Sequence, residues 1–307
     1  MSDNPKTIKL PNRTVIHTLD ISPNGAQLVI GQDSTKGHSN LSLWSLPGLQ
    51  LLSELEHEKH ELMLMARYFP DGKTLAYVDS TLQPCLLDFE QQKVSRLKLK
   101  NPRVQWLAPA PKSNRVVLAG ALTQVWDASR SKVIWQLPGQ VASRDPDSIP
   151  AVAALDPSET QIAVAAVEEG CIQIYDLDRP EPVQRLTGAP DQARWVGIDP
   201  GARYLAAVEW YSHGIFLWDL SNGEKLLPDV FGPEFESYWC LRFDPEGKYL
   251  ALGMLSGYVV VIRLPDGEFI IDEQQHKGRV WDLAFTPDGK HLISGGDDAT
   301  LCLWDLS

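Results

Sequence analysis

Residues 276–305 read HKGRVWDLAFTPDGKHLISGGDDATLCLWD, and this stretch decides the fold. Two apolar segments flank Pro287–Gly289, whose proline and glycine favour a tight hairpin turn. An acidic turn at Asp297–Asp298 precedes a third apolar segment, which ends in Trp304–Asp305. The stretch therefore predicts three consecutive antiparallel strands joined by tight turns.

A turn of the same kind recurs along the chain. Its prolines are separated by 47, 41, 46, 43, 45 and 42 residues and lie at Pro23, Pro70, Pro111, Pro157, Pro200, Pro245 and Pro287. The third-strand endings recur in phase, at Trp44, Leu87, Trp126, Tyr175, Trp218, Ile262 and Trp304. A period of about 40–45 residues is typical of the four-stranded blades of a β-propeller. Both landmarks predict seven blades.

This repeat resembles that of the WD40-repeat family over nearly the whole sequence. The resemblance implies an all-β, seven-bladed propeller, in which a blade can be locked by four side chains hydrogen-bonded in series. The seventh blade carries the full set of four, at His276, Ser294, Asp298 and Trp304. The other six blades depart from this pattern, so the resemblance indicates an architecture and not a subfamily.

We expect one domain, with blades at approximately 14–57, 58–100, 101–140, 148–188, 190–233, 234–275 and 276–307. The seventh blade has only three strands in this scheme. Residues 6–10 precede the first blade, and we expect them to supply the missing outer strand and close the ring. A closed ring leaves no long exposed strand edge.

Tryptophans at the third-strand endings are expected in the core, whereas Trp135 lies on an outer strand and is expected to be half-buried. The sequence has a net charge of −12 and no run of basic residues, which argues against a nucleic-acid partner. Its four cysteines show no C-x-x-C spacing, so neither a metal site nor a disulfide framework is expected.

Motifs of targeting and of catalysis are missing from the sequence. It shows neither a signal peptide nor an apolar run of membrane-spanning length, which favours a reduced, cytoplasmic protein without membrane contact. It also lacks a nucleophile elbow and both common phosphate-binding glycine motifs. We therefore expect no catalytic residues and no cofactor.

The resemblance also implies a binding site at the mouth of the central channel. Two positions at the start of each innermost strand, and one in the turn before the third strand, face that mouth in WD40 proteins and bind peptides and proteins. Counting from each turn proline predicts as partner-binding residues His17, Arg103, Arg194, Trp210, Trp239, Leu255, Arg279 and Trp281. Trp and Arg are enriched at binding hot spots.

The sequence thus favours a non-catalytic platform, a subunit of a complex, that binds a protein or peptide with an acidic residue facing the arginines. One alternative is a propeller enzyme with its site in the central channel, for which only His17 and Asp297 qualify as titratable groups. Another is an RNA-associated scaffold. Trp239 and Trp281 also fit a position packed between blades, because an offset of one residue reverses the face of a strand side chain.

Overall fold

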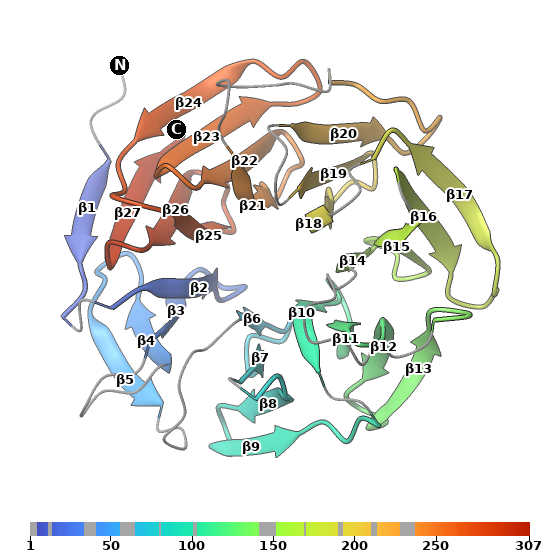
Figure 1. Ribbon diagram of the computed structural model, residues 1–307. Coiled ribbons are helices and arrows are strands. Elements are labelled where there is room, and N and C mark those ends of the chain that lie inside the picture. Colours follow the sequence, from blue (N-terminus) through green and yellow to red (C-terminus); the bar gives the residue numbers. More distant parts are fainter. Residues whose placement is uncertain are drawn as a thin grey trace.

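The computed structural model describes residues 5–11, 14–33, 41–55, 65–79, 81–100, 103–140, 152–168, 170–189, 193–209, 214–227 and 237–307. Within these ranges the protein forms strands and no helix. The strands make seven separate sheets that surround a central channel (Figure 1). The predicted all-β, seven-bladed propeller is confirmed.

In each blade the first three strands run outward from the channel in sequence order. The innermost strands are β2 (Ile16–Ile21), β6 (Met65–Tyr68), β10 (Val104–Pro109), β14 (Val152–Leu155), β18 (Ala193–Ile198), β21 (Tyr238–Phe243) and β25 (Val280–Phe285). The second strands are β3 (Gln27–Gln32), β7 (Thr74–Val78), β11 (Arg115–Gly120), β15 (Gln161–Glu168), β19 (Tyr204–Glu209), β22 (Tyr249–Met254) and β26 (His291–Gly296).

The third strands carry the repeated tryptophan position. They are β4 (Leu41–Ser45), β8 (Pro84–Asp88), β12 (Gln124–Asp127), β16 (Cys171–Asp176), β20 (Ile215–Asp219), β23 (Tyr258–Arg263) and β27 (Thr300–Asp305). The outer strands are β5 (Leu51–Leu55), β9 (Lys93–Arg96), β13 (Lys132–Gln136), β17 (Pro182–Thr187), β24 (Phe269–Gln274) and β1 (Lys6–Lys9). In blade 5 the described residues form three strands and one further bridge, between Trp218 and Lys225.

The N-terminal strand closes the ring. β1 pairs antiparallel with β27, so that Thr7 lies opposite Cys302 and Ile8 opposite Leu301 (Figure 1). Just after β1, Leu10 is 1% exposed and packs in a cluster that includes Trp44 of the first blade. The prediction that this segment completes the last blade is confirmed.

Several first hairpins are held by the aspartate that precedes the turn proline. Asp244 Oδ1 accepts hydrogen bonds from the backbone N–H groups of Lys248 and Tyr249, both at 2.6 Å. Asp156 and Asp199 accept from the backbone four and five residues later in the same way. This contact explains the recurrence of Asp-Pro at the turns, since a short carboxylate satisfies backbone donors that the turn leaves free.

The core lies between neighbouring blades. The tryptophans at the ends of third strands are all buried, at Trp44, Trp126, Trp218 and Trp304. The expectation for Trp135 was wrong, because its side chain is buried rather than half-buried. Its ring lies 5.9 Å from the ring of Tyr175 in the next blade, so this outer-strand residue joins two sheets.

Blade 7 contains a connected set of polar side chains. His276 lies 3.0 Å from Asp298 Oδ1 through Nδ1 and 2.7 Å from Ser294 Oγ through Nε2. Trp304 Nε1 donates to the same Ser294 Oγ at 2.9 Å. Burial opposes the charge of the imidazole, but its interactions with Asp298 and Cys302 outweigh it and raise the pKa of His276 to about 9. The charged ring donates from both nitrogens and thereby links the segment before β25 to Ser294 on β26 and to Asp298 in the turn before β27.

Candidate functional site

A repeated β-bulge forms the mouth of the channel at the start of the innermost strands. In five blades the pairing of the first two strands skips one residue, namely His17, Gln105, Arg194, Trp239 and Trp281. A bulge leaves its extra residue out of the ladder and turns that side chain away from the normal alternation. Local backbone geometry therefore places these five side chains at equivalent points around the mouth.

Two arginines enclose one tryptophan at this mouth. The guanidinium carbon of Arg194 lies 3.2 Å from the ring centroid of Trp239, and that of Arg279 lies 3.9 Å from the same centroid. Arg194 Nε also donates to the backbone carbonyl of Trp239 at 3.0 Å. Trp239 is only 6% exposed, so it supports the two half-buried guanidinium groups and offers little surface of its own.

Trp281 continues the cluster toward blade 1. Its ring lies edge-on to Trp239 at 5.2 Å and to His17 at 4.6 Å. Its Nε1 donates to Asp297 Oδ1 at 2.6 Å, which fixes the orientation of the indole. The imidazole of His17 is fixed in turn by Asp33, which lies 2.8 Å from His17 Nε2. Trp281 itself is half-buried and keeps part of its ring open to solvent.

The electrostatics of this cluster favour an anion. Burial, and to a lesser degree the charge of Arg279, lower the pKa of Arg194 to about 9. The carboxylate of Asp297 is already hydrogen-bonded to Trp281 Nε1 and to the backbone N–H of Arg279, at 2.6 and 2.9 Å. The Nε of Arg279 is buried and has no hydrogen-bond partner among the described residues. Two guanidinium groups therefore share one small site and repel each other.

The structure brings together five of the eight residues predicted for partner binding. We call the set His17, Arg194, Trp239, Arg279 and Trp281 the rim cluster. Leu255 is half-buried, and its backbone N–H donates to Ser237 beside Trp239, but it shows no contact with the rings of the cluster in the described part of the protein. Arg103 is exposed at the start of blade 3. Trp210 lies outside the described residues.

A second group of charged residues lies deeper in the channel, and the sequence reasoning missed it. Asp282 is 1% exposed and lies 2.8 Å from Arg67 Nη2 of blade 2 and 2.8 Å from Arg242 Nη2 of blade 6. It also accepts hydrogen bonds from Thr18 Oγ1 and the backbone of Leu19, both at 3.1 Å. The sequence pointed to His17 and Asp297 as titratable groups at the mouth and did not reach these interior ones.

Aromatic rings extend this interior layer to the opposite side of the ring. Arg242 lies 4.4 Å and Arg67 lies 5.8 Å from the ring centroid of Trp195 in blade 5. Trp195 meets Trp106 of blade 3 edge-on at 4.6 Å, and Trp106 Nε1 donates to the carbonyl of Ala153 in blade 4 at 2.8 Å. Contacts thus run through all seven blades at this level.

A clear signal in the sequence marks these interior residues. Arg67, Arg242 and Asp282 each interrupt an innermost strand that is otherwise mostly apolar. A charge in such a strand is expensive to bury without a partner, so each one indicates an ion pair inside the ring. The alignment by turn prolines considered only the start of each strand and passed over these positions.

Comparison with known proteins identifies the repeat. The family model described as "WD domain, G-beta repeat" matches residues 267–305. The chain is similar to protein SOF1 of Saccharomyces cerevisiae, at 24% identity over 60% of this chain and 36% of that protein. It is also similar to transcription factor unc-37 of Caenorhabditis elegans, at 28% identity over 49% of this chain and 24% of that protein. The last blade thus carries a WD40 repeat, and the chain resembles WD40-repeat proteins.

Protein groucho of Drosophila melanogaster is a further WD40-type relative, with 28% identity over 48% of this chain. The matches to these three relatives span between 19 and 36% of their length, well under two thirds. WD40 propellers generally act as non-catalytic scaffolds that bind proteins. The resemblance does not identify the subfamily.

In the part of this propeller that the structure describes, no group of three or more His, Cys, Asp or Glu side chains is placed to hold a metal ion. The same residues contain no apolar helix of membrane-spanning length.

Proposed function

We propose that the protein is a non-catalytic interaction platform whose rim cluster binds an acidic segment of a partner protein. The observation that carries the proposal is the stack of Arg194, Trp239 and Arg279. Two like charges lie within 4 Å of one ring centroid, at 3.2 and 3.9 Å, and burial lowers the pKa of Arg194. A partner carboxylate placed between the two guanidinium groups relieves their repulsion and accepts charge-assisted hydrogen bonds.

The surroundings of the rim cluster support an acidic partner. The protein as a whole has a net charge of −12, so the two arginines form a local exception to its average. Such an exception attracts an acidic segment to this mouth and disfavours its binding elsewhere on the molecule. The Nε of Arg279, which has no partner among the described residues, is a donor that a bound carboxylate can satisfy.

The shape of the cluster supports a protein or peptide as the ligand. Trp and Arg are the residues most enriched at interaction hot spots, where they lie on a rigid and well-packed base. Trp239 supplies that base, because it is buried between two side chains and held by Arg194 at its backbone carbonyl. Trp281 supplies open aromatic surface and is fixed by Asp297.

Affinity capture from the source cells, followed by mass spectrometry, tests the proposal. We expect Arg279→Gln and Trp281→Ala to remove the partners captured by the wild-type protein. Arg263→Gln is the matched control, because Arg263 ends the third strand of blade 6, its side chain is 41% exposed, and it pairs with Asp266 in the turn that follows. Capture that is unchanged in the rim variants contradicts the proposal, and partners that disappear on nuclease treatment indicate an RNA-associated role instead.

We also propose that the platform works in the cytoplasm. Its four cysteines are all buried and none is joined in a disulfide, which suits a reducing compartment. Imaging of the tagged full-length protein tests this location, and a secreted protein would contradict it.

A further inference from the structure

A cavity of about 540 Å³ lies at the other mouth of the channel, away from the rim cluster. It opens where the first hairpins turn, and five turn prolines contribute to its lining, at Pro23, Pro70, Pro111, Pro157 and Pro200. The interior layer of Asp282, Arg67 and Arg242 separates it from the rim cluster. The cavity has the size that small-ligand sites usually have.

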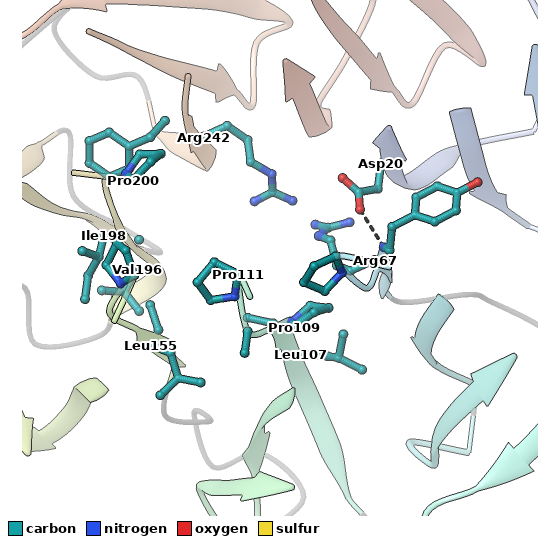
Figure 2. A pocket seen from close by; sticks show the side chains of 18 of the residues that line it. Asp20, Arg67, Leu107, Pro109, Pro111, Leu155, Val196, Ile198, Pro200 and Arg242 are labelled. Atoms are coloured by element: carbon teal, nitrogen blue, oxygen red, sulfur yellow. Dashed lines mark hydrogen bonds between the residues drawn. The ribbon is translucent and has the colours of Figure 1, made fainter. Parts of the chain in front are cut away.

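The two sides of this cavity differ in chemistry (Figure 2). Blades 3 to 5 contribute an apolar wall, which includes Leu107, Pro109, Pro111, Leu155, Val196 and Ile198. The opposite side carries Asp20, Arg67 and Arg242, whose polar ends point toward the cavity in Figure 2. A ligand that fits both sides has an apolar body and one charged end.

The charges favour an anion at that end. Two guanidinium groups, of Arg67 and Arg242, contact the single carboxylate of Asp282. Asp20 accepts a hydrogen bond from the backbone N–H of Tyr68 at 2.8 Å and forms no ion pair with either arginine within the described residues. The charges of Arg67 and Arg242 act on Asp20 without a direct contact. Two guanidinium groups of this layer thus contact one carboxylate.

Arg242 is the arginine available to a ligand. Arg67 Nη1 already donates to Thr18 Oγ1 and to two backbone carbonyls. Arg242 makes two hydrogen bonds, to the carbonyl of Leu241 and to Asp282, and a guanidinium group has five N–H donors. Burial, and then the charge of Arg67, lower the pKa of Arg242 to about 10, so an anion beside it is favoured.

We propose that this cavity binds an apolar group that ends in a carboxylate, with Arg242 as the anion-binding side chain. The carboxylate lies against the free donors of Arg242, and the apolar body lies on the wall of blades 3 to 5. This site is separate from the rim cluster, so a small acid or a polypeptide end is held at one mouth while a partner protein occupies the other.

Calorimetric titration of the full-length protein with three matched eight-carbon probes tests the proposal. We expect octanoate to bind at least tenfold more tightly than octanol, and octylammonium to bind most weakly. Equal affinity for octanoate and octanol, tighter binding of octylammonium, or no binding of octanoate overturns the proposal. This series uses the wild-type protein and does not depend on the folding of any variant.

Two substitutions assign the charge effect to the site. Arg242→Gln is expected to reduce octanoate affinity to that of octanol and to leave octanol unchanged. Asp20→Asn is expected to raise octanoate affinity severalfold, because it removes the competing carboxylate. Arg263→Gln is the matched control and should change neither. If Asp20→Asn leaves octanoate affinity unchanged or lowers it, the proposal is contradicted even where Arg242→Gln fails to fold.

The source of the carboxylate is distinguished by a second pair of probes. An N-acetylated tripeptide that ends in leucine is compared with its C-terminal amide. Tighter binding of the free-acid peptide than of octanoate assigns the cavity to the C-terminus of a polypeptide, and the reverse order assigns it to a small acid. Both outcomes support the proposal. Equal binding of the peptide and its amide contradicts assignment of the cavity to a polypeptide C-terminus, and the comparison of octanoate with octanol then tests the proposal.

Discussion

Arg242 donates a hydrogen bond from Nη2 to Asp282 Oδ1 at 2.8 Å, and this contact joins blade 6 to blade 7 inside the channel. Asp282 makes a second ion pair of 2.8 Å with Arg67, so a single carboxylate connects blades 2, 6 and 7. The closed ring is what brings these three strands together. The ion pairs therefore depend on closure and in turn resist the opening of the ring.

The first prediction concerns this carboxylate. Asp282→Asn leaves two buried guanidinium groups without a counter-ion, and breaking a buried pair in this way typically costs about 3–5 kcal/mol. We expect a loss of that size in the free energy of unfolding, measured by urea denaturation. Asp266→Asn, which removes an exposed partner of Arg263, should leave the midpoint unchanged. A similar small effect from both substitutions would show that the interior layer does not stabilise the ring.

The second prediction concerns closure by β1. Deletion of residues 1–10 removes the strand paired with β27 and exposes the apolar cluster around Leu10. We expect a clear fall in Tm and a tendency to aggregate, because the outer edge of blade 7 is then unpaired. A truncated protein with the full Tm would contradict closure by this strand.

A cross-link provides a test in the opposite direction. Thr7 lies opposite Cys302, and Thr7 Oγ1 is 3.7 Å from Cys302 Sγ. Thr7→Cys is expected to form a disulfide with Cys302 on oxidation and to raise Tm, since the bond closes a loop of nearly the whole sequence. Under reducing conditions the same variant should melt like the wild-type protein. Lys9→Cys is the matched control, because Lys9 lies opposite Thr300 and not opposite a cysteine.

The third prediction is a pH dependence of stability that arises from His276. Its pKa in the folded protein is about 9, above the ordinary value of 6.5, so the folded state holds this proton more tightly than the unfolded state does. The stabilisation is therefore complete below pH 6.5 and is lost as the pH rises through about 9.

Denaturant titrations from pH 6 to pH 10 measure this effect. We expect the wild-type protein to lose about 3 kcal/mol across that range relative to His276→Gln, at about 1.4 kcal/mol per pKa unit. If the free energies of unfolding of the two proteins changed with pH in parallel, His276 would be neutral in the folded state.

The fourth prediction separates two tryptophans of the rim cluster. Trp239 is buried between two arginines, so Trp239→Ala is expected to reduce the free energy of unfolding by about 3–5 kcal/mol. Trp281 is half-buried, and Trp281→Ala should cost only about 1–2 kcal/mol. Urea denaturation of both variants checks the order. Equal losses would place Trp281 in the core and remove it as a contact residue.

Much of this fold could be predicted from the sequence, because its signals are local. A proline marks each hairpin, a glycine follows it in five of the seven, and the spacing of the prolines sets the size of the repeat. Counting from Pro245 and Pro287 also reached Trp239 and Trp281, since every innermost strand keeps the same offset from its turn. Local signals repeated seven times thus predicted the ring and the position of its mouth.

The contacts inside the ring could not be predicted in the same way. Strand alternation does not anticipate a bulge, and the bulges at Arg194 and Trp239 are what allow Arg194 and Arg279 to lie on one ring. The pairing of Arg67 with Asp282 depends on closure, which brings together strands from opposite ends of the sequence. The burial of Trp135 likewise depends on its neighbour Tyr175 in the next blade.

The most direct test of the rim cluster as the partner-binding site is site-specific photo-crosslinking in the source cells. A photoreactive phenylalanine analogue is placed at Trp281, or at Phe269, which is exposed on β24 of blade 6, and the cross-linked peptides are identified by mass spectrometry. We predict that position 281 captures peptides rich in Asp and Glu and that position 269 does not. Cross-links to RNA or to neutral peptides at position 281, or partners captured at position 269 alone, would contradict the account.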